Sequence, residues 1–110
     1  MAMTEAPAGV ALTTSLQTIY ENDSESGLRK TVRIRFVNVD GTNDADISAC
    51  NFEDASPAAS FAMLPVNTLV AATDGVEVTK VLDPGDSVEA SASADGDIVA
   101  LPEVIFAETL

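Results

Sequence analysis

The sequence predicts an all-β fold, a single β-sandwich of about seven or eight short strands with an N-terminal arm. Val, Ile and Thr, whose branched side chains favour strands, supply 27 of the 110 residues. Turn-forming residues recur about every 8–12 positions, and no helical period persists for more than about two turns. A jelly roll and an immunoglobulin-like topology both fit this spacing.

Residues 1–15 are expected to form an extended arm, and residues 16–110 to form the sandwich domain. The start of the arm, Met1–Gly9, is rich in small residues and contains a proline and a glycine, which is typical of a linker. Extended character begins within Val10–Tyr20. The acidic segment Glu21–Gly27 contains no apolar residue and predicts a solvated loop.

The clearest strand is Lys30–Val39, in which apolar side chains alternate with polar and basic ones. Its apolar face is expected to comprise Val32, Ile34 and Phe36. The segment Asp40–Asp44 (DGTND) is the strongest turn signal in the chain, and a second strand follows at Asp46–Phe52. These two strands are therefore expected to form a hairpin.

Prolines and glycines divide the rest of the chain. Pro57 interrupts the strand pattern because it has no N–H to donate, and Pro65 either bends one strand or separates two. Asp83–Asp86 is a Pro-Gly turn, Asp95–Asp97 is expected to close another hairpin, and Pro102 indicates a bulge or an edge. The remaining expected strand segments are Ser60–Leu64, Val66–Ala72, Val76–Leu82, Ser87–Ser93 and Ile98–Ala107.

The charge balance restricts the classes of partner. Five basic residues against 18 acidic ones give a net charge of −13, which repels nucleic-acid backbones and anionic membrane surfaces. We therefore expect no nucleic-acid partner and no membrane partner. The first residues do not resemble a signal peptide, and no apolar run approaches the length of a membrane span.

The residue types also argue against catalysis, so we expect a protein that is not an enzyme and has no cofactor. Without histidine there is no Ser-His or Cys-His pair and no Cys/His zinc site. The carboxylates fall mostly in turns or on the polar phase of strands, where solvation explains them. Cys50 cannot form an internal disulfide and is expected to be a small buried apolar residue.

Calcium is an alternative raised by two acidic loops. Asp40, Thr42, Asp44 and Asp46 place oxygen atoms at alternate positions, and Asp95 and Asp97 flank a glycine. The spacing is not that of an EF-hand, and turn formation explains both loops without a metal. We therefore expect no metal site.

Four of the five basic residues lie within seven positions: Arg29, Lys30, Arg33 and Arg35. Strand alternation places Arg29, Arg33 and Arg35 with Thr31 on the outward face. One interpretation is pairing with acids on neighbouring strands. The other is a docking stripe for an acidic protein surface, because arginine pairs with carboxylates through two nitrogen atoms at once.

Four elements also follow one another along residues 15–108. They are Thr18-Ile19-Tyr20, the basic and apolar strand Val32–Asn38, the Pro-Gly-Asp turn and alternating strand of Leu82–Ser93, and the closing Glu108. In this order the chain resembles small structural proteins of tailed-bacteriophage virions, of the capsid decoration or cement type. The resemblance implies no catalytic residue.

The resemblance implies binding to the major capsid protein and to neighbouring copies of the chain, with a trimer as one arrangement. It places the protein on the capsid surface of the virion, after synthesis in the host cytoplasm. A tail, neck or fibre-base protein of the virion is the first alternative. A calcium- or carbohydrate-binding sandwich module is a further one, although the chain has no tryptophan and one tyrosine for a sugar platform.

Overall fold

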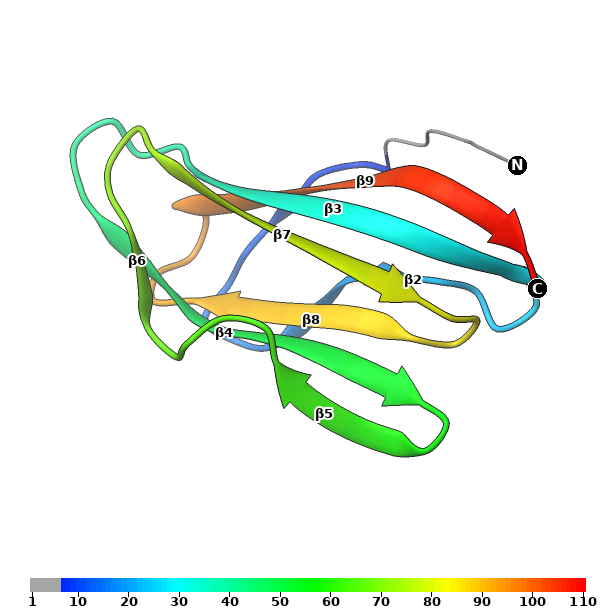
Figure 1. The fold of residues 1–110 in the computed structure, drawn as a ribbon. Helices are drawn as coiled ribbons and strands as arrows, with labels where there is room; N and C mark the ends of the chain where they lie inside the picture. Colours follow the sequence, from blue (N-terminus) through cyan, green and yellow to red (C-terminus); the bar gives the residue numbers. More distant parts are fainter. Residues whose placement is uncertain (1–6) are drawn as a thin grey trace.

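A computed structural model describes residues 7–110, which form two antiparallel β-sheets packed face to face (Figure 1). The strands are β1 (Val10–Ala11), β2 (Gln17–Glu21), β3 (Leu28–Asn38), β4 (Ala45–Ala55), β5 (Ala58–Ala62), β6 (Thr68–Val70), β7 (Gly75–Leu82), β8 (Ser87–Ala92) and β9 (Ile98–Thr109). The predicted all-β sandwich is confirmed. Within residues 7–110 no helix is long and apolar enough to cross a membrane.

The strand order is that of a jelly roll rather than an immunoglobulin-like sandwich. Sheet A has the order β1-β9-β3-β7, and sheet B has the order β2-β8-β4-β5, with β6 also paired to β4. The antiparallel pairs are nested, since β1 pairs with β9, β2 with β8, β3 with β7 and β4 with β5. The chain is therefore one long folded hairpin wrapped into two layers.

The alternation expected at Lys30–Val39 is confirmed in β3. Val32, Ile34 and Phe36 are each at most 1% exposed and point toward sheet B. Because β3 lies between β7 and β9, its outward residues are flanked on both sides by other strands.

The two expected hairpins are wrong. β3 belongs to sheet A and β4 to sheet B, so the turn at 40–44 carries the chain across the sandwich, and β8 and β9 are separated in the same way. Asn38 stabilises the connection from β3 to β4, because its Nδ2 donates to the carbonyls of Asn43 and Val70, both at 3.0 Å. The same turn residues suit a chain that reverses within a sheet and one that changes sheets.

The boundary expected at residue 15 also differs. Val10 and Ala11 pair with Ala100 and Val99, and Leu12 is fully buried with its N–H donating to the Ile98 carbonyl at 2.8 Å. These residues belong to the sandwich because they complete the edge of sheet A and its core. Only residues 7–9 of the expected arm are described outside the sandwich, and residues 1–6 lie outside the described range.

The segment around Pro65 forms two short strands rather than one bent strand. Both β5 and β6 pair with β4 on the same side, and Pro57 lies in the turn between β4 and β5. In β9 the irregular register falls at Ile105, since Thr31 pairs with Phe106 and the next residue of β3 pairs with Val104. Pro102 is therefore not the bulge; it lies beyond the part of β9 that pairs with β1.

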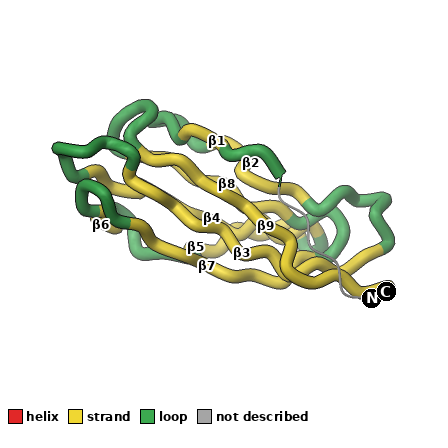
Figure 2. Tube along the Cα trace, turned by 90° about the horizontal axis from the view of Figure 1, so that it is seen from above, coloured by secondary structure: helices red, strands yellow, loops and turns green. Residues whose placement is uncertain are grey.

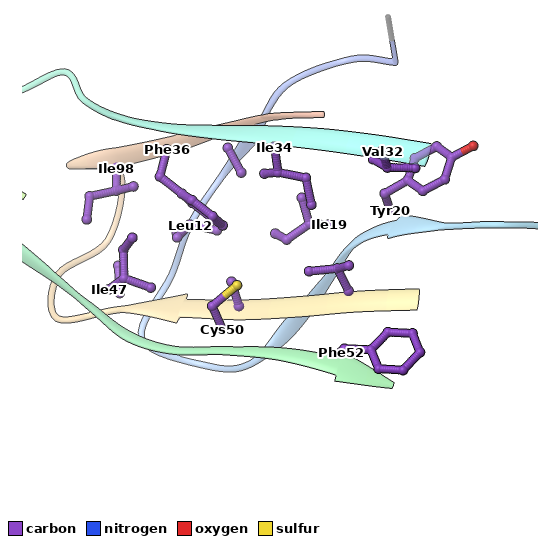
Figure 3. Close-up of a cluster of buried hydrophobic side chains, with 14 of the residues drawn as sticks. Leu12, Ile19, Tyr20, Val32, Ile34, Phe36, Ile47, Cys50, Phe52 and Ile98 are labelled. Atoms are coloured by element: carbon purple, nitrogen blue, oxygen red, sulfur yellow. The ribbon is translucent and has the colours of Figure 1, made fainter. Parts of the chain in front are cut away.

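The core lies between the sheets and is built from apolar side chains of both (Figure 3). The bulkiest fully buried side chains are those of Leu12, Ile34, Phe36, Ile47, Leu82 and Ile98. Cys50 is buried among them, and this burial raises the pKa of its thiol to about 11. The expectation of a buried apolar cysteine is confirmed.

A candidate docking face on sheet A

The outward surface of β3 and of its neighbours β7 and β9, called here the outer face, contains most of the basic stripe. Residues directly opposite one another in an antiparallel pair share a face. The register therefore gathers Thr31, Arg33, Arg35, Glu77, Thr79, Val81, Leu101, Glu103 and Phe106 on this side of sheet A. β3 runs through the middle of the outer face, so its arginines lie at the centre.

Arg33 lies between two carboxylates. Its Nη2 donates to Oε1 of Glu103 on β9, and its Nε lies 3.9 Å from Oε2 of Glu77 on β7. The hydrogen bond with Glu103 is the largest cause that raises the pKa of the Arg33 guanidinium. Arg33 therefore fits the first of the two interpretations, in which the basic residues pair with acids on neighbouring strands.

Arg29 is also paired, at one end of β3. Its Nε donates to Oδ1 of Asp83 at 2.7 Å, and this hydrogen bond raises the pKa of the guanidinium. Lys30 points the opposite way. Its Nζ donates to the Tyr20 hydroxyl at 3.1 Å and lies 5.8 Å from the centre of that ring. Lys30 is therefore separate from the outer face, which keeps Arg33 and Arg35 at its centre.

Arg35 is exposed and differs from the other two arginines. It forms no ion pair with any residue in the range 7–110. Its neighbours across the strands are Glu77 and Leu101, and it helps to line a shallow hollow of about 350 Å³. Among residues 7–110, Arg35 is therefore a positive group without an ion pair, beside the apolar side chain of Leu101.

The N-terminal segment leaves the sandwich at this hollow. Pro7 lines it together with Arg35 and Leu101. Gly9 passes so close to Leu101 that a Cβ atom on residue 9 would lie 2.8 Å from the leucine Cδ2. A side chain at residue 9 would therefore require the partly exposed end of the Leu101 side chain to shift. Residues 7–9 and the outer face therefore adjoin each other.

Three apolar side chains on the outer face are partly open to solvent, and sequence reasoning had not singled them out. Val81 is 48% exposed, Leu101 44% and Phe106 40%. Val81 shares the strand phase of Glu77 and Thr79, which was the available signal that it points outward. Arginine and aromatic residues beside apolar ones form the composition that protein interfaces favour.

The carboxylates of the acidic loops accept hydrogen bonds from backbone N–H groups. Asp40 Oδ1 accepts from the backbone N–H groups of Thr42 and Asn43, and the hydrogen bond with Thr42 is the largest cause that lowers the pKa of Asp40. Asp95 Oδ1 accepts from the Thr14 N–H at 3.0 Å. Over residues 7–110, no three His, Cys, Asp or Glu side chains gather as a group that could hold a metal ion.

No known family model matches the chain, and no curated protein matches its sequence. The fold, the charge and the outer face are therefore the basis for a functional proposal.

Proposed function

We propose that the protein is a non-enzymatic structural protein of a bacteriophage virion, which binds the assembled capsid surface through the outer face of sheet A and stabilises the shell. The major capsid protein is the main partner, and neighbouring copies of the chain complete the contacts. The resemblance of the sequence elements to decoration proteins supports this role, and no catalytic group takes part in it.

The observation that carries the proposal is the position of Arg35. Its guanidinium has no ion pair within residues 7–110, lies beside the half-exposed Leu101, and borders the hollow that Pro7 lines. An acidic group of a partner would find a bidentate donor there, with apolar surface to bury around it. Pro7, which precedes β1, lines the same hollow, so one surface presents both the basic group and this part of the N-terminal segment.

The fold and the charge are compatible with this role. Jelly rolls are one of the architectures of viral capsid domains, although they also occur in lectins. A net charge of −13 keeps free copies apart at high concentration, so that binding depends on a specific complementary site.

The first test is the copy number of the chain, relative to the major capsid protein, in purified particles of the phage that encodes it. A ratio close to that of the capsid protein is expected, because a decoration protein follows the shell lattice. A few copies per particle would instead indicate the tail, neck or fibre base. Absence from the particles would refute the virion role.

The second test uses shells that lack the protein and measures binding by co-sedimentation. Arg35→Glu is expected to weaken binding roughly ten-fold or more, because it replaces a cation that has no ion pair within residues 7–110 with a repelling charge. Arg29→Glu is the matched control, since Arg29 is already paired with Asp83 at the end of the strand. Equal binding by wild type and Arg35→Glu would exclude the outer face as the contact.

A further inference from the structure

The sandwich is open along the side formed by the edge strands β5 and β7. Figure 2 shows these two strands along one side of the molecule and β1 and β2 along the other. β7 is the last strand of sheet A and β5 the last strand of sheet B. Between them lies a groove of about 700 Å³, lined by Phe52, Phe61, Ala62, Met63, Leu64, Glu77, Val78, Thr79 and Lys80.

The groove exists because β5 projects beyond the cover that sheet A provides. Lys80 of β7 places its Nζ 4.5 Å from the centre of the Phe52 ring, so β7 packs over β4. Phe61 on β5 stacks against Phe52, with ring centres 6.2 Å apart, but is 55% exposed. In Figure 1, β5 lies at the lower edge of the molecule, beside β4.

The uncovered position is that of one further strand in sheet A. β7 pairs with β3 on one side only, so the N–H and C=O groups along its other edge have no strand partner within residues 7–110. A strand added there would place alternate side chains over Phe61, which lies opposite the buried Phe52 and shares its inward face, because side chains of a strand alternate between its two faces. Four residues on each wall line the groove, which suits a segment of about four to six extended residues.

Lys80 determines the charge that this strand would carry. Its side chain points into the groove, and no described carboxylate lies within ion-pair distance of its Nζ. Glu77, the acid on the same strand, lies toward Arg33 at 3.9 Å. A carboxylate on the groove-facing side of the added strand would therefore complement the charge of Lys80.

We propose that the groove between β5 and β7 binds an extended peptide segment of a partner protein by strand addition to β7. The segment has apolar side chains at alternate positions and an acidic side chain that pairs with Lys80. Main-chain hydrogen bonds to β7 supply affinity, and the side-chain alternation supplies specificity. This groove is separate from Arg35 and Leu101, so peptide binding does not require the outer face.

The test is an NMR titration of the ¹⁵N-labelled protein with a capped hexapeptide. The peptide carries valine, valine and glutamate at alternate positions, with threonine between them. Binding at millimolar concentration is expected, with shifts concentrated in the amides of β7 and β5. Replacing the peptide glutamate with glutamine, or making Lys80→Gln, is expected to weaken binding roughly two- to five-fold, the range for a partly exposed ion pair.

Two matched controls separate the groove from general surface effects. Lys30→Gln removes a cation that also lies near an aromatic ring but outside the groove, and it is expected to leave binding unchanged. Phe61→Ser is expected to reduce binding several-fold, whereas Leu69→Ser, at a residue that is 59% exposed and outside the groove, is not. Arg35→Glu is expected to have no effect, even if the capsid proposal fails.

Three results would overturn the proposal. The first is an absence of shifts in β5 and β7 at millimolar peptide. The second is tighter binding of decanoate than of the peptide at the same amides, which would make the groove a site for amphiphilic small molecules. The third is a dimer in light scattering that the peptide does not dissociate and whose formation protects the β7 amides, which would make a second copy the occupant.

Discussion

Asn22 tests the jelly-roll arrangement most directly, because it joins the two sheets at one end of the sandwich. It follows β2 of sheet B and is fully buried. Its Nδ2 donates to the carbonyl of Leu28 on β3 and to that of Leu82 on β7, both at 2.9 Å, while its Oδ1 accepts from the Ser26 hydroxyl at 2.8 Å. Asn22→Ala removes all three hydrogen bonds.

The size of the loss follows from the burial of the groups left behind. The Leu82 carbonyl is buried, and leaving it without Asn22 costs about 1–3 kcal/mol. The Leu28 carbonyl is partly buried and keeps a weaker contact with Ser26, so its loss adds about 0.5–1.5 kcal/mol. The free energy of unfolding is therefore expected to fall by about 2–4 kcal/mol, a large part of the roughly 5–15 kcal/mol usual for a domain.

The assay is urea unfolding followed by far-UV circular dichroism. With an m-value of about 2 kcal/mol per molar urea, the midpoint is expected to fall by about 1–2 M. Asn51→Ala is the matched control, because Asn51 is half-buried and its side chain has no hydrogen bond with another described residue. A midpoint for Asn22→Ala equal to that of Asn51→Ala would refute the view that Asn22 joins the sheets.

Three further predictions test the core, the thiol and the ion pairs. Leu12→Ala is expected to lower the free energy of unfolding by about 2–5 kcal/mol in urea melts, whereas Leu16→Ala, at a residue that is 51% exposed, changes it by less than about 1 kcal/mol. Equal effects of the two variants would show that Leu12 is not part of the core. Burial raises the pKa of Cys50 from 9.0 to about 11, so the unfolded chain loses its thiol proton at a lower pH than the folded protein. The stability contributed by this group is therefore fully present below about pH 9 and is lost as the pH rises to 11. Cys50→Ala is expected to flatten the stability profile over that pH range, and an unchanged slope would contradict the burial. Arg33→Gln is expected to lower the melting temperature slightly at low salt and not at about 1 M NaCl, since its pairs with Glu77 and Glu103 are partly exposed and screened; a salt-independent loss would show that packing dominates.

Strand positions could be predicted from the sequence wherever side-chain alternation was strong. Val32, Ile34 and Phe36 lie in the core as expected, because period-two alternation reports which face of a strand is buried. The Pro-Gly turn at 83–86 also formed, with Gly85 at a φ of +92° and the Asp86 N–H donating to the Asp83 carbonyl. These features depend on neighbouring residues alone.

Strand partners could not be predicted in the same way. The turns at 40–44 and 95–97 were interpreted as hairpins, but each connects one sheet to the other. β3 instead pairs with β7 and β9, which lie far along the chain. A local turn signal states that the chain reverses, and it contains no information about which strand will lie beside it.

The candidate site shows the same contrast between what the local sequence indicates and what distant strands decide. Alternation placed Arg33 and Arg35 on an outward face, but no local pattern identifies Glu77 and Glu103 as the partners of Arg33. Nor does such a pattern reveal that Arg35 is left unpaired within the described residues. Those outcomes depend on cross-strand register, which brings together residues from three separate strands.

The amino-acid sequence by itself determined the all-β class, the inward faces of the main strands, the positions of the turns and the strong negative charge. Only the tertiary structure decided the jelly-roll order, the burial of Leu12, the pairing of the basic residues and the open side between β5 and β7. The physical reason is the range of the interactions. Alternation and turn geometry act over a few residues, whereas sheet pairing and the packing of one sheet on another select among partners that are distant in sequence.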